Sequence, residues 1–335
     1  MLNNKSILIT GGTGSFGKVF LDHCLKRYKK IKKIIIFSRD ELKQFELREK
    51  YFRQKKYINK IRFFLGDVRD LHRLRTAFED VDYVVHAAAL KQVESSEYNP
   101  LEVIKTNIIG AQNVIDSAIY NRVKKVVALS TDKASSPINL YGASKLCSDK
   151  LFLSSNNTKG SKDISFSIVR YGNVLGSRGS VLPEFINQNK RKEFKITDDR
   201  MTRFNILLND GVKFVDDVLH KAVGGEIFVP KMSSFKILDL AKSISKTNKI
   251  SIVGIRPGEK IHEEVISNQD SRSTFDFKRY FVILSDNKAL EKFYEKKFKA
   301  KKVNSNFVYS SNLNKKWLTI NDLKKMLKKN KFILN

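Results

Sequence analysis

The stretch SILITGGTGSFGKVF, residues 6–20, joins a run of β-branched residues to an amphipathic helical pattern through a glycine-rich turn. Its glycines include three at three-residue spacing, Gly11, Gly14 and Gly17. Glycine permits a tight turn and a close backbone approach, so the free amides of the helix N-terminus can meet a pyrophosphate. Spacing alone would be weak evidence, but here a strand precedes it and a helix follows. The stretch predicts a dinucleotide cradle formed by Gly11, Thr13, Gly14, Ser15, Phe16 and Gly17.

The first half of the chain repeats this alternation of strand and helix. Short β-branched runs predict strands at residues 6–10, 33–37, 61–66, 83–88, 125–130 and 165–171. Amphipathic patterns predict helices between them, including residues 17–28, 70–78 and 99–121. Such alternation is typical of βαβ units whose parallel sheet is covered on both faces. We therefore expect an α/β fold with a doubly wound parallel sheet of the Rossmann type.

Past residue 173 the alternation gives way to loops and shorter elements. One more apolar run, residues 226–230, predicts a late strand that returns to the sheet. We expect a Rossmann domain over residues 1–172, to which residues 206–232 return. Residues 173–205 and 233–335 are expected to form mainly a smaller C-terminal substrate domain and the tail.

The composition is strongly basic, with 64 lysines and arginines against 35 acids and a formal net charge of +29. Such a charge can attract polyanions. The lysines are scattered through solvent-facing runs, however, and no recognition helix or stacked-aromatic motif accompanies them. We expect phosphate-bearing small molecules, not nucleic acid, as the main ligands.

The apolar runs and the cysteines exclude other classes. No apolar run approaches the length of a membrane span, and MLNNKSILIT enters a strand without a signal-peptide pattern. We expect a cytoplasmic protein that has no membrane partner. The only cysteines, Cys24 and Cys147, are badly spaced for a structural zinc site, so we predict two buried thiols and no metal.

The end of the second predicted strand indicates which dinucleotide is bound. It places Ser38, Arg39, Asp40 and Lys43 where an acid would contact ribose hydroxyls or a base would accept a 2′-phosphate. Arg39 and Lys43 favour NADP, because a guanidinium can bind phosphate with paired hydrogen bonds. The alternative is a solvated basic turn.

Two later strand ends complete the predicted cofactor site. Asp67 and Val68 follow the third strand, where the adenine would lie, and Ala87 and Ala88 would lie beneath the cofactor. His86 is interpreted as a packed strand residue, not as a catalyst.

The stretch STDKASSPINLYGASK, residues 130–145, follows the fifth strand and carries the candidate chemistry. Tyr141 and Lys145 are four residues apart and therefore share one helical face. A nearby ammonium favours the phenolate, which can take a hydroxyl proton while hydride leaves the same carbon. The alternative interpretation is a polar loop of a soluble domain.

These motifs, with HAAALK, RYGNVLGSRGSV, ITDDRMTRF and IRPGEKIHE, resemble the extended short-chain dehydrogenase/reductase family. Within it, the chain is similar to the UDP-N-acetylglucosamine 4,6-dehydratases that invert carbon 5, the first enzymes of pseudaminic acid synthesis. The resemblance runs from about residue 5 to the tail SSNLNKKWLTINDL. It implies an NADP-dependent lyase of polysaccharide biosynthesis that forms homo-oligomers, dimers or hexamers.

The resemblance also implies roles for four residues. Tyr141 would assist oxidation at carbon 4, and Lys145 would hold the nicotinamide ribose. Lys133 would be the base at carbon 5, with a pKa lowered by desolvation, and Asp132 the acid for the leaving 6-hydroxyl. The alternative for Asp132 and Lys133 is a surface ion pair.

Contacts to the nucleotide sugar are implied for a further set of residues. They are Lys91, which would also reach the cofactor, Thr106, Asn107, Asn173, Val181, Thr197, Arg203, Arg256 and Glu259. Singly, each could equally be a solvated charge or a loop-stabilising contact. Three alternatives stay open for the whole chain: a dehydratase that retains carbon 5, a 4-epimerase of a UDP-amino sugar, and a non-catalytic NADP-binding or polyanion-binding protein.

Overall fold

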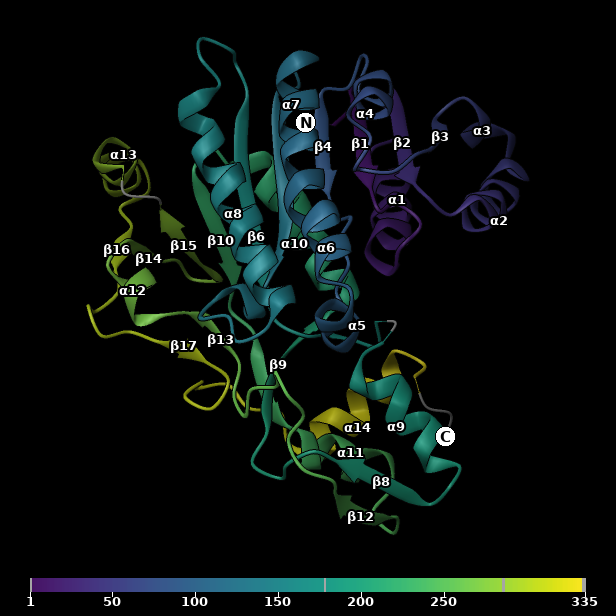
Figure 1. Cartoon of the computed structure of the whole chain (residues 1–335), viewed down its shortest axis with the longest axis vertical. Coiled ribbons are helices and arrows are strands. Elements are labelled where there is room, and N and C mark those ends of the chain that lie inside the picture. The colour runs from purple at the N-terminus through teal and green to yellow at the C-terminus, as the bar shows by residue number, and fades with distance from the viewer. Residues whose placement is uncertain (1, 178, 285–286, 333–335) are drawn as a thin grey trace.

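A computed structural model describes residues 2–177, 179–284 and 287–332, and a ten-stranded sheet forms the centre of this part of the chain (Figure 1). Seven strands run parallel, in the order β3-β2-β1-β4-β5-β6-β10. Their bounds are β1 Ser6–Thr10, β2 Lys33–Ser38, β3 Ile61–Leu65, β4 Tyr83–His86, β5 Lys125–Thr131, β6 Ser165–Tyr171 and β10 Glu226–Pro230. Three strands, β15 Tyr280–Leu284, β14 Thr274–Asp276 and β16 Lys301–Lys302, continue the sheet antiparallel.

This strand order confirms the α/β doubly wound prediction. The first six strands have the order of dinucleotide-binding folds. Strands β1 to β3 extend the sheet in one direction and β4 to β6 in the other, so the strand order reverses between β1 and β4. Each predicted strand overlaps an observed strand, including the late one at residues 226–230. Ligands of such sheets bind outside the carboxyl ends of the strands where the strand order reverses. The fold therefore predicts a binding site at the carboxyl ends of β1 and β4.

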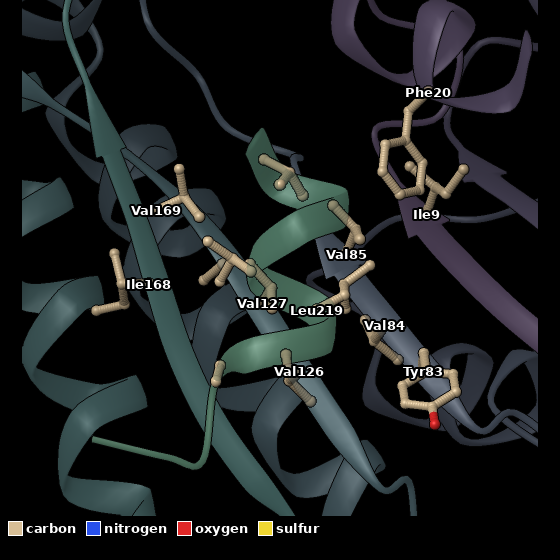
Figure 2. Close-up of a cluster of buried hydrophobic side chains, with 14 of the residues drawn as sticks. Ile9, Phe20, Tyr83, Val84, Val85, Val126, Val127, Ile168, Val169 and Leu219 are labelled. Atoms are coloured by element: carbon tan, nitrogen blue, oxygen red, sulfur yellow. The ribbon is translucent and has the colours of Figure 1, made fainter. Parts of the chain in front are cut away.

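The sheet is held by apolar side chains that are buried on both of its faces. Every residue of β1, β4 and β6 is buried, as expected for parallel strands that helices cover. Figure 2 shows Ile9, Val85 and Val127 on neighbouring strands, with Phe20 of α1 and Leu219 of α10 packed over this region. The β-branched runs therefore form strands because both faces of each strand are covered.

Helices flank the sheet along its length (Figure 1). Their bounds are α1 Ser15–Arg27, α2 Glu41–Phe52, α3 Lys55–Ile58, α4 Leu71–Ala77, α5 Val93–Tyr98, α6 Pro100–Val103, α7 Gly110–Tyr120, α8 Leu140–Thr158 and α10 Leu208–Lys221, with the 3-10 turn η2 at Asp132–Ala134. Side-chain caps begin several of them: Asp40 caps α2, Asp70 caps α4 and Asn139 caps α8. The caps place the helix starts at the carboxyl edge of the sheet.

The predicted continuous helix over residues 99–121 is interrupted. Its middle, η1 at Ile104–Ile109, is a π-helical turn between α6 and α7. A π-turn adds a residue to the helix and is frequent at functional sites. Here it buries Thr106 and Asn107, both polar, at the sheet end of the helix. Hydrophobic periodicity could not indicate this insertion, because the apolar residues on either side keep a helical spacing.

A second, smaller hydrophobic cluster forms from the segments after residue 173. It joins Leu175, Phe185, Phe194, Phe235 and Leu323, among others. The elements of the C-terminal half are β7 Val174–Leu175, α9 Val181–Asn189, β8 Glu193–Ile196, β9 Thr202–Leu207, β11 Ser233–Lys236, α11 Ile237–Ile244, β12 Lys249–Ile252, β13 Glu264–Ile266, α12 Asn268–Ser271, α13 Lys288–Phe298, β17 Tyr309–Ser310 and α14 Ile320–Lys329. In Figure 1, α9, α11 and α14 lie together below the sheet.

The cysteines follow the prediction only in part. Cys24 is a buried thiol on α1, as expected, but Cys147 is exposed, so that prediction was wrong. Cys147 lies on a solvent-facing position of α8, whereas Lys145 and Ser148 face inward. Within the described residues, no helix is long and apolar enough to cross a membrane, and no cluster of metal-binding side chains occurs.

We predict that Gly17→Ala destabilises the protein. A Cβ at Gly17 would lie 2.4 Å from the carbonyl oxygen of Gly12, so helix α1 would have to move away from the turn. Such overpacking costs about 1–3 kcal/mol. Gly211→Ala is the matched control, because its Cβ would meet only Ile206 Cδ1, at 3.7 Å, within helix α10. Urea unfolding should show Gly211→Ala unchanged or stabilised; equal stabilities would contradict the argument.

Candidate active site

The turn between β1 and α1 leaves room for a ligand at its backbone. Gly11 has a φ of +66°, and a Cβ there would lie 2.9 Å from the amide nitrogen of Ala88, on the neighbouring strand's end. Helix α1 begins at Ser15, and its N-cap residue Gly14 offers no side chain, so no side chain caps its first amides. The positive end of a helix with free amides suits a phosphate. The turn therefore fits the pyrophosphate of a dinucleotide.

A cavity of about 700 Å³ opens in front of this turn. The residues that line it include all but one of those predicted for the cofactor: Gly11, Thr13, Gly14, Ser15, Phe16, Ser38, Arg39, Asp40, Lys43, Asp67, Val68, Ala87, Ala88, Lys91, Tyr141 and Lys145. Gly17 is the exception. It is buried against Gly12, so it allows α1 to pack closely and does not line the cavity.

The far end of this cavity is charged. Arg39 is half-exposed, with Nη1 3.6 Å from Asp67 Oδ2, and Lys43 is paired with Asp40. Arg69 also holds Asp67, at 2.7 Å. The charges of Arg69 and Arg39 and hydrogen bonds from Arg69 lower the pKa of Asp67, although burial opposes them. Both predicted phosphate-binding cations therefore line the cavity, each near an acid.

Helix α8 brings Tyr141 and Lys145 to the middle of the cavity. Asn139 Oδ1 accepts a hydrogen bond from the amide of Gly142 at 2.8 Å, which fixes the start of the helix beside Tyr141. Burial raises the pKa of Tyr141 to about 12, although the ammonium of Lys133 and the hydroxyl of Thr131 oppose this. Burial lowers the pKa of Lys145, against the charge of Asp149.

The charges around Tyr141 differ from the expected ones. We expected the Lys145 ammonium to draw the phenol of Tyr141 toward its anion. Instead, the groups that favour the phenolate are Lys133 and Thr131, from the segment before α8. Helical spacing predicted that the two residues share one face, and both line the cavity, but it could not include the charge on a neighbouring segment.

Asp132 and Lys133 lie on η2, directly after β5, where they reach the cavity floor. The side chain of Asp132 is 1 % exposed and that of Lys133 is 23 % exposed, so their 3.3 Å contact is not a surface ion pair. Asp132 Oδ1 also accepts a hydrogen bond from the Thr131 hydroxyl at 2.9 Å, and Oδ2 has no partner among the described residues. Burial raises the pKa of Asp132, and the Glu263 charge acts in the same direction, against the Lys133 charge. A raised pKa brings a carboxyl closer to the role of a proton donor.

Lys133 contradicts the expected lowering of its pKa. Burial alone would lower it, but the charges of Asp132 and Glu263 outweigh burial and raise the pKa of Lys133 above its ordinary value. Glu263 Oε1 accepts a hydrogen bond from Lys133 Nζ at 2.9 Å. The amine is therefore enclosed, as expected, but it is held as an ammonium.

A second cavity of about 520 Å³ adjoins the first and shares Lys91, Lys133 and Asn173 with it. Most of the predicted substrate residues line it: Lys91, Asn173, Val181, Thr197, Arg203, Arg256 and Glu259. Thr106 lines the first cavity. Among the described residues, Asn173 Oδ1 and Thr106 Oγ1 are buried oxygens that lack a hydrogen-bond partner. Unpaired polar atoms of this kind suit a polar ligand between the two cavities.

Three predicted substrate residues are engaged within the protein. Asn107 lines neither cavity; its amide binds both backbone groups of Leu90 and the hydroxyl of Ser144, so the structure does not bring it to the predicted sugar site. Arg203 Nη1 donates to the carbonyls of Thr202 and Ile261. Arg256 is exposed and lies 3.4 Å from Glu94.

Sequence reasoning missed Glu263. This buried residue belongs to the quoted motif IRPGEKIHE, in which Arg256 and Glu259 were chosen. Its signal was weak: it is the first of two consecutive acids before the apolar residues Val265 and Ile266 of β13, Glu264–Ile266, and only the second acid belongs to the strand. Because its partner Lys133 is 130 residues away in the chain, no local pattern connects them.

The doubly wound sheet and the Tyr141/Lys145 pair define the class, an α/β protein of the extended short-chain dehydrogenase/reductase type. The chain belongs to the polysaccharide biosynthesis protein family, which it matches over residues 7–285. It is 52% identical over 332 residues, covering 96% of this chain and 97% of the relative, to a UDP-N-acetylglucosamine 4,6-dehydratase (inverting) of Campylobacter jejuni.

Other relatives carry a different name or are known as structures. A UDP-glucose 4-epimerase of Rickettsia bellii is 44% identical over 297 residues, which cover 87% of this chain and 86% of the epimerase. The X-ray structure of Pen from Bacillus thuringiensis superposes with a TM-score of 0.89 at 37% identity, covering 99% of this chain and all of that one. The arrangement of the whole chain is therefore shared with a solved structure.

We predict that His86 makes stability depend on pH. Burial and the Lys145 charge lower the pKa of His86 to about 3, from about 6.5 in an unfolded chain. Between these values only the unfolded state binds the proton, so His86 costs stability as pH falls below about 6.5, by up to about 1.4 kcal/mol per pH unit. His86→Gln should flatten the dependence of the unfolding free energy on pH between these limits. Parallel curves for both proteins would contradict the prediction.

Proposed function

We propose that the chain is an NADP-dependent 4,6-dehydratase of UDP-N-acetylglucosamine that inverts carbon 5. The observation that carries the proposal is the buried Asp132 and Lys133 pair beside Tyr141, at the junction of two cavities that fit a dinucleotide and a nucleotide sugar. The relative at 52% identity bears this activity in its name. The product would be UDP-2-acetamido-2,6-dideoxy-β-L-arabino-hex-4-ulose, and loss of water makes the enzyme a hydro-lyase.

The proposed reaction begins at carbon 4 of the sugar. Bound NADP would supply a hydride acceptor there and later return the hydride to carbon 6. Tyr141 takes the proton of the 4-hydroxyl, aided by the Thr131 hydroxyl, which favours the phenolate. Lys145, buried one helical turn further along α8, would hold the nicotinamide ribose.

Elimination follows because a ketone at carbon 4 acidifies the hydrogen on carbon 5. Lys133, as the neutral amine, takes this hydrogen, and Asp132 protonates the departing 6-hydroxyl. Burial raises the pKa of Asp132, which favours the protonated carboxyl that this step requires. Proton delivery to the opposite face of carbon 5 then gives the L-configured sugar.

A 4-epimerase is the second candidate, because relatives at 42–44% identity are named UDP-glucose 4-epimerase. Epimerisation needs only removal and return of hydride at carbon 4 and gives no task to a buried acid and amine. The Asp132 and Lys133 pair therefore favours dehydration.

Lys133→Met should abolish dehydration. The variant keeps the length of the side chain but removes the amine, so the rate of water loss should fall by at least about 100-fold. Lys213→Ala is the control, because Lys213 is an exposed lysine of α10 outside both cavities. NMR of the product formed from UDP-N-acetylglucosamine in deuterated water checks stereochemistry. Solvent deuterium at carbon 5 of an L-sugar is expected; a D-sugar would indicate retention, and a 4-epimer would indicate an epimerase.

Arg39→Ala should weaken the binding of NADP and leave the binding of NAD unchanged. The guanidinium is half-exposed at the cavity's end and is proposed to bind the 2′-phosphate, a charged hydrogen bond worth about 1.5–3 kcal/mol. Titration calorimetry should show a loss of at least about tenfold for NADP. An equal loss for both dinucleotides would assign Arg39 to another part of the cofactor.

We also propose that the chain assembles with copies of itself. Helices α5 to α7 expose Tyr98, Leu101, Ile109 and Tyr120, a set of large apolar side chains on neighbouring helices. Exposed apolar patches of this kind often mark protein interfaces.

A further inference from the structure

Glu263 is a buried acid that the reaction described above does not use. Its Oε1 accepts a hydrogen bond from Lys133 Nζ at 2.9 Å and lies 3.6 Å from Nε of Arg203. Its side chain is 3 % exposed, and Oε2 finds no hydrogen-bond partner in the described part of the chain. A buried carboxylate with one empty oxygen is costly, so its retention calls for a reason.

The backbone holds this carboxylate firmly in place. The amide of Glu263 donates to Ser311 Oγ at 2.9 Å, and the amide of Ser311 donates to the Glu263 carbonyl at 2.7 Å. Ser311 Oγ is itself bound to Thr202 Oγ1 at 2.7 Å. These hydrogen bonds hold the backbone of Glu263 in place. The position of its carboxylate relative to Lys133 is therefore better defined than in an ion pair between two mobile surface side chains.

The charges around the pair define its proton content. Asp132 and Tyr141 face Lys133, while Arg203 and Lys260 act on Glu263. Burial alone would raise the pKa of Glu263, but the Lys133 and Arg203 charges outweigh it and lower the pKa. The resting pair is therefore an ammonium and a carboxylate that share one proton along a 2.9 Å hydrogen bond.

A base at carbon 5 must be the neutral amine, so the resting ammonium has to lose a proton first. Glu263 Oε1, at 2.9 Å, is a closer acceptor than Asp132 Oδ1, at 3.3 Å. Filling the cavities with a nucleotide sugar would expel water from the pair, and a low dielectric favours two neutral groups over two charged ones. Transfer within the pair needs no exchange with solvent.

We propose that Glu263 is a positioning residue that accepts the Lys133 proton when the nucleotide sugar binds, which leaves a neutral amine aimed into the cavity. The inference rests on the proposed dehydration. An O–H bond forms at Glu263 as an N–H bond breaks at Lys133. The amine then forms a new N–H bond as the C–H bond at carbon 5 breaks. The electron pair of the broken C–H bond stays on the sugar, where the neighbouring ketone stabilises it. The step needs no oxidant or reductant.

The pH dependence of turnover tests the proposal. In the native protein the proton stays within the pair, so kcat for UDP-N-acetylglucosamine should be nearly independent of pH around neutrality. In Glu263→Gln the ammonium must lose its proton to solvent. Its kcat should fall about 100-fold at pH 7 and rise about tenfold per pH unit as pH increases, with KM little changed. Glu263→Asp should restore part of the rate and the flat profile.

Glu264→Gln is the matched control. This neighbouring acid accepts a hydrogen bond from Ser136 Oγ at 2.7 Å, and it lines neither cavity. It should keep the native rate and profile. A Glu263→Gln variant with native kcat at every pH, or with the same fractional loss at every pH, would overturn the proposal, because a purely structural role produces no change in slope.

Infrared difference spectroscopy separates this inference from the proposed function. Adding UDP-N-acetylglucosamine and NADP to the native protein should produce a protonated-carboxyl band that Glu263→Gln lacks. If the band appears but no dehydrated product forms, the proposed function fails and the proton transfer stands. If product forms without the band, the proton-transfer proposal is wrong and the dehydratase assignment stands.

Discussion

The hydrogen-bonded ion pair between Lys133 and Glu263 is the contact on which the arrangement of the site depends. It ties the turn after β5 to the start of β13, segments 130 residues apart. Nearby Arg203 lies between Met201 and Phe204, which belong to the smaller and the larger hydrophobic cluster respectively. Buried charges are tolerated only when they are paired. The turn after β5 and the segment before β13 must therefore pack against each other in one arrangement, in which Lys133 and Glu263 meet. The same requirement that fixes the architecture therefore places a titratable amine between the two cavities.

Much of the fold could be predicted because it is written in local patterns. Buried parallel strands need continuous apolar runs, and each of the seven predicted strands overlaps an observed one, from Ser6–Thr10 to Glu226–Pro230. The π-turn at Ile104–Ile109 escaped prediction, since one added residue leaves the surrounding periodicity intact. The antiparallel strand β16, Lys301–Lys302, consists of two lysines and exists through pairing with β14, which no propensity of its own could indicate.

The site divides in the same way. Residues attached to strand ends and helix starts, such as Tyr141 and Asp132, could be located because the fold brings those positions to one edge of the sheet. The sequence could not predict properties that depend on residues far away in the chain. The pKa of Lys133 is raised instead of lowered because Asp132 and the remote Glu263 outweigh burial. Asn107 was predicted to contact the sugar, yet its amide is engaged by the backbone of Leu90 and the hydroxyl of Ser144.

The short edge strand β16 has a consequence for the basic character of the chain. A sheet edge offers unpaired amides and carbonyls to any other extended chain, and long apolar edges promote aggregation. Here the ten-stranded sheet ends in Lys301 and Lys302, both exposed. Lys302 is paired with Glu291 at 2.8 Å, so the protection comes from the brevity of the strand together with the lysine that precedes it. Lysine at this edge therefore disfavours β-pairing with another molecule.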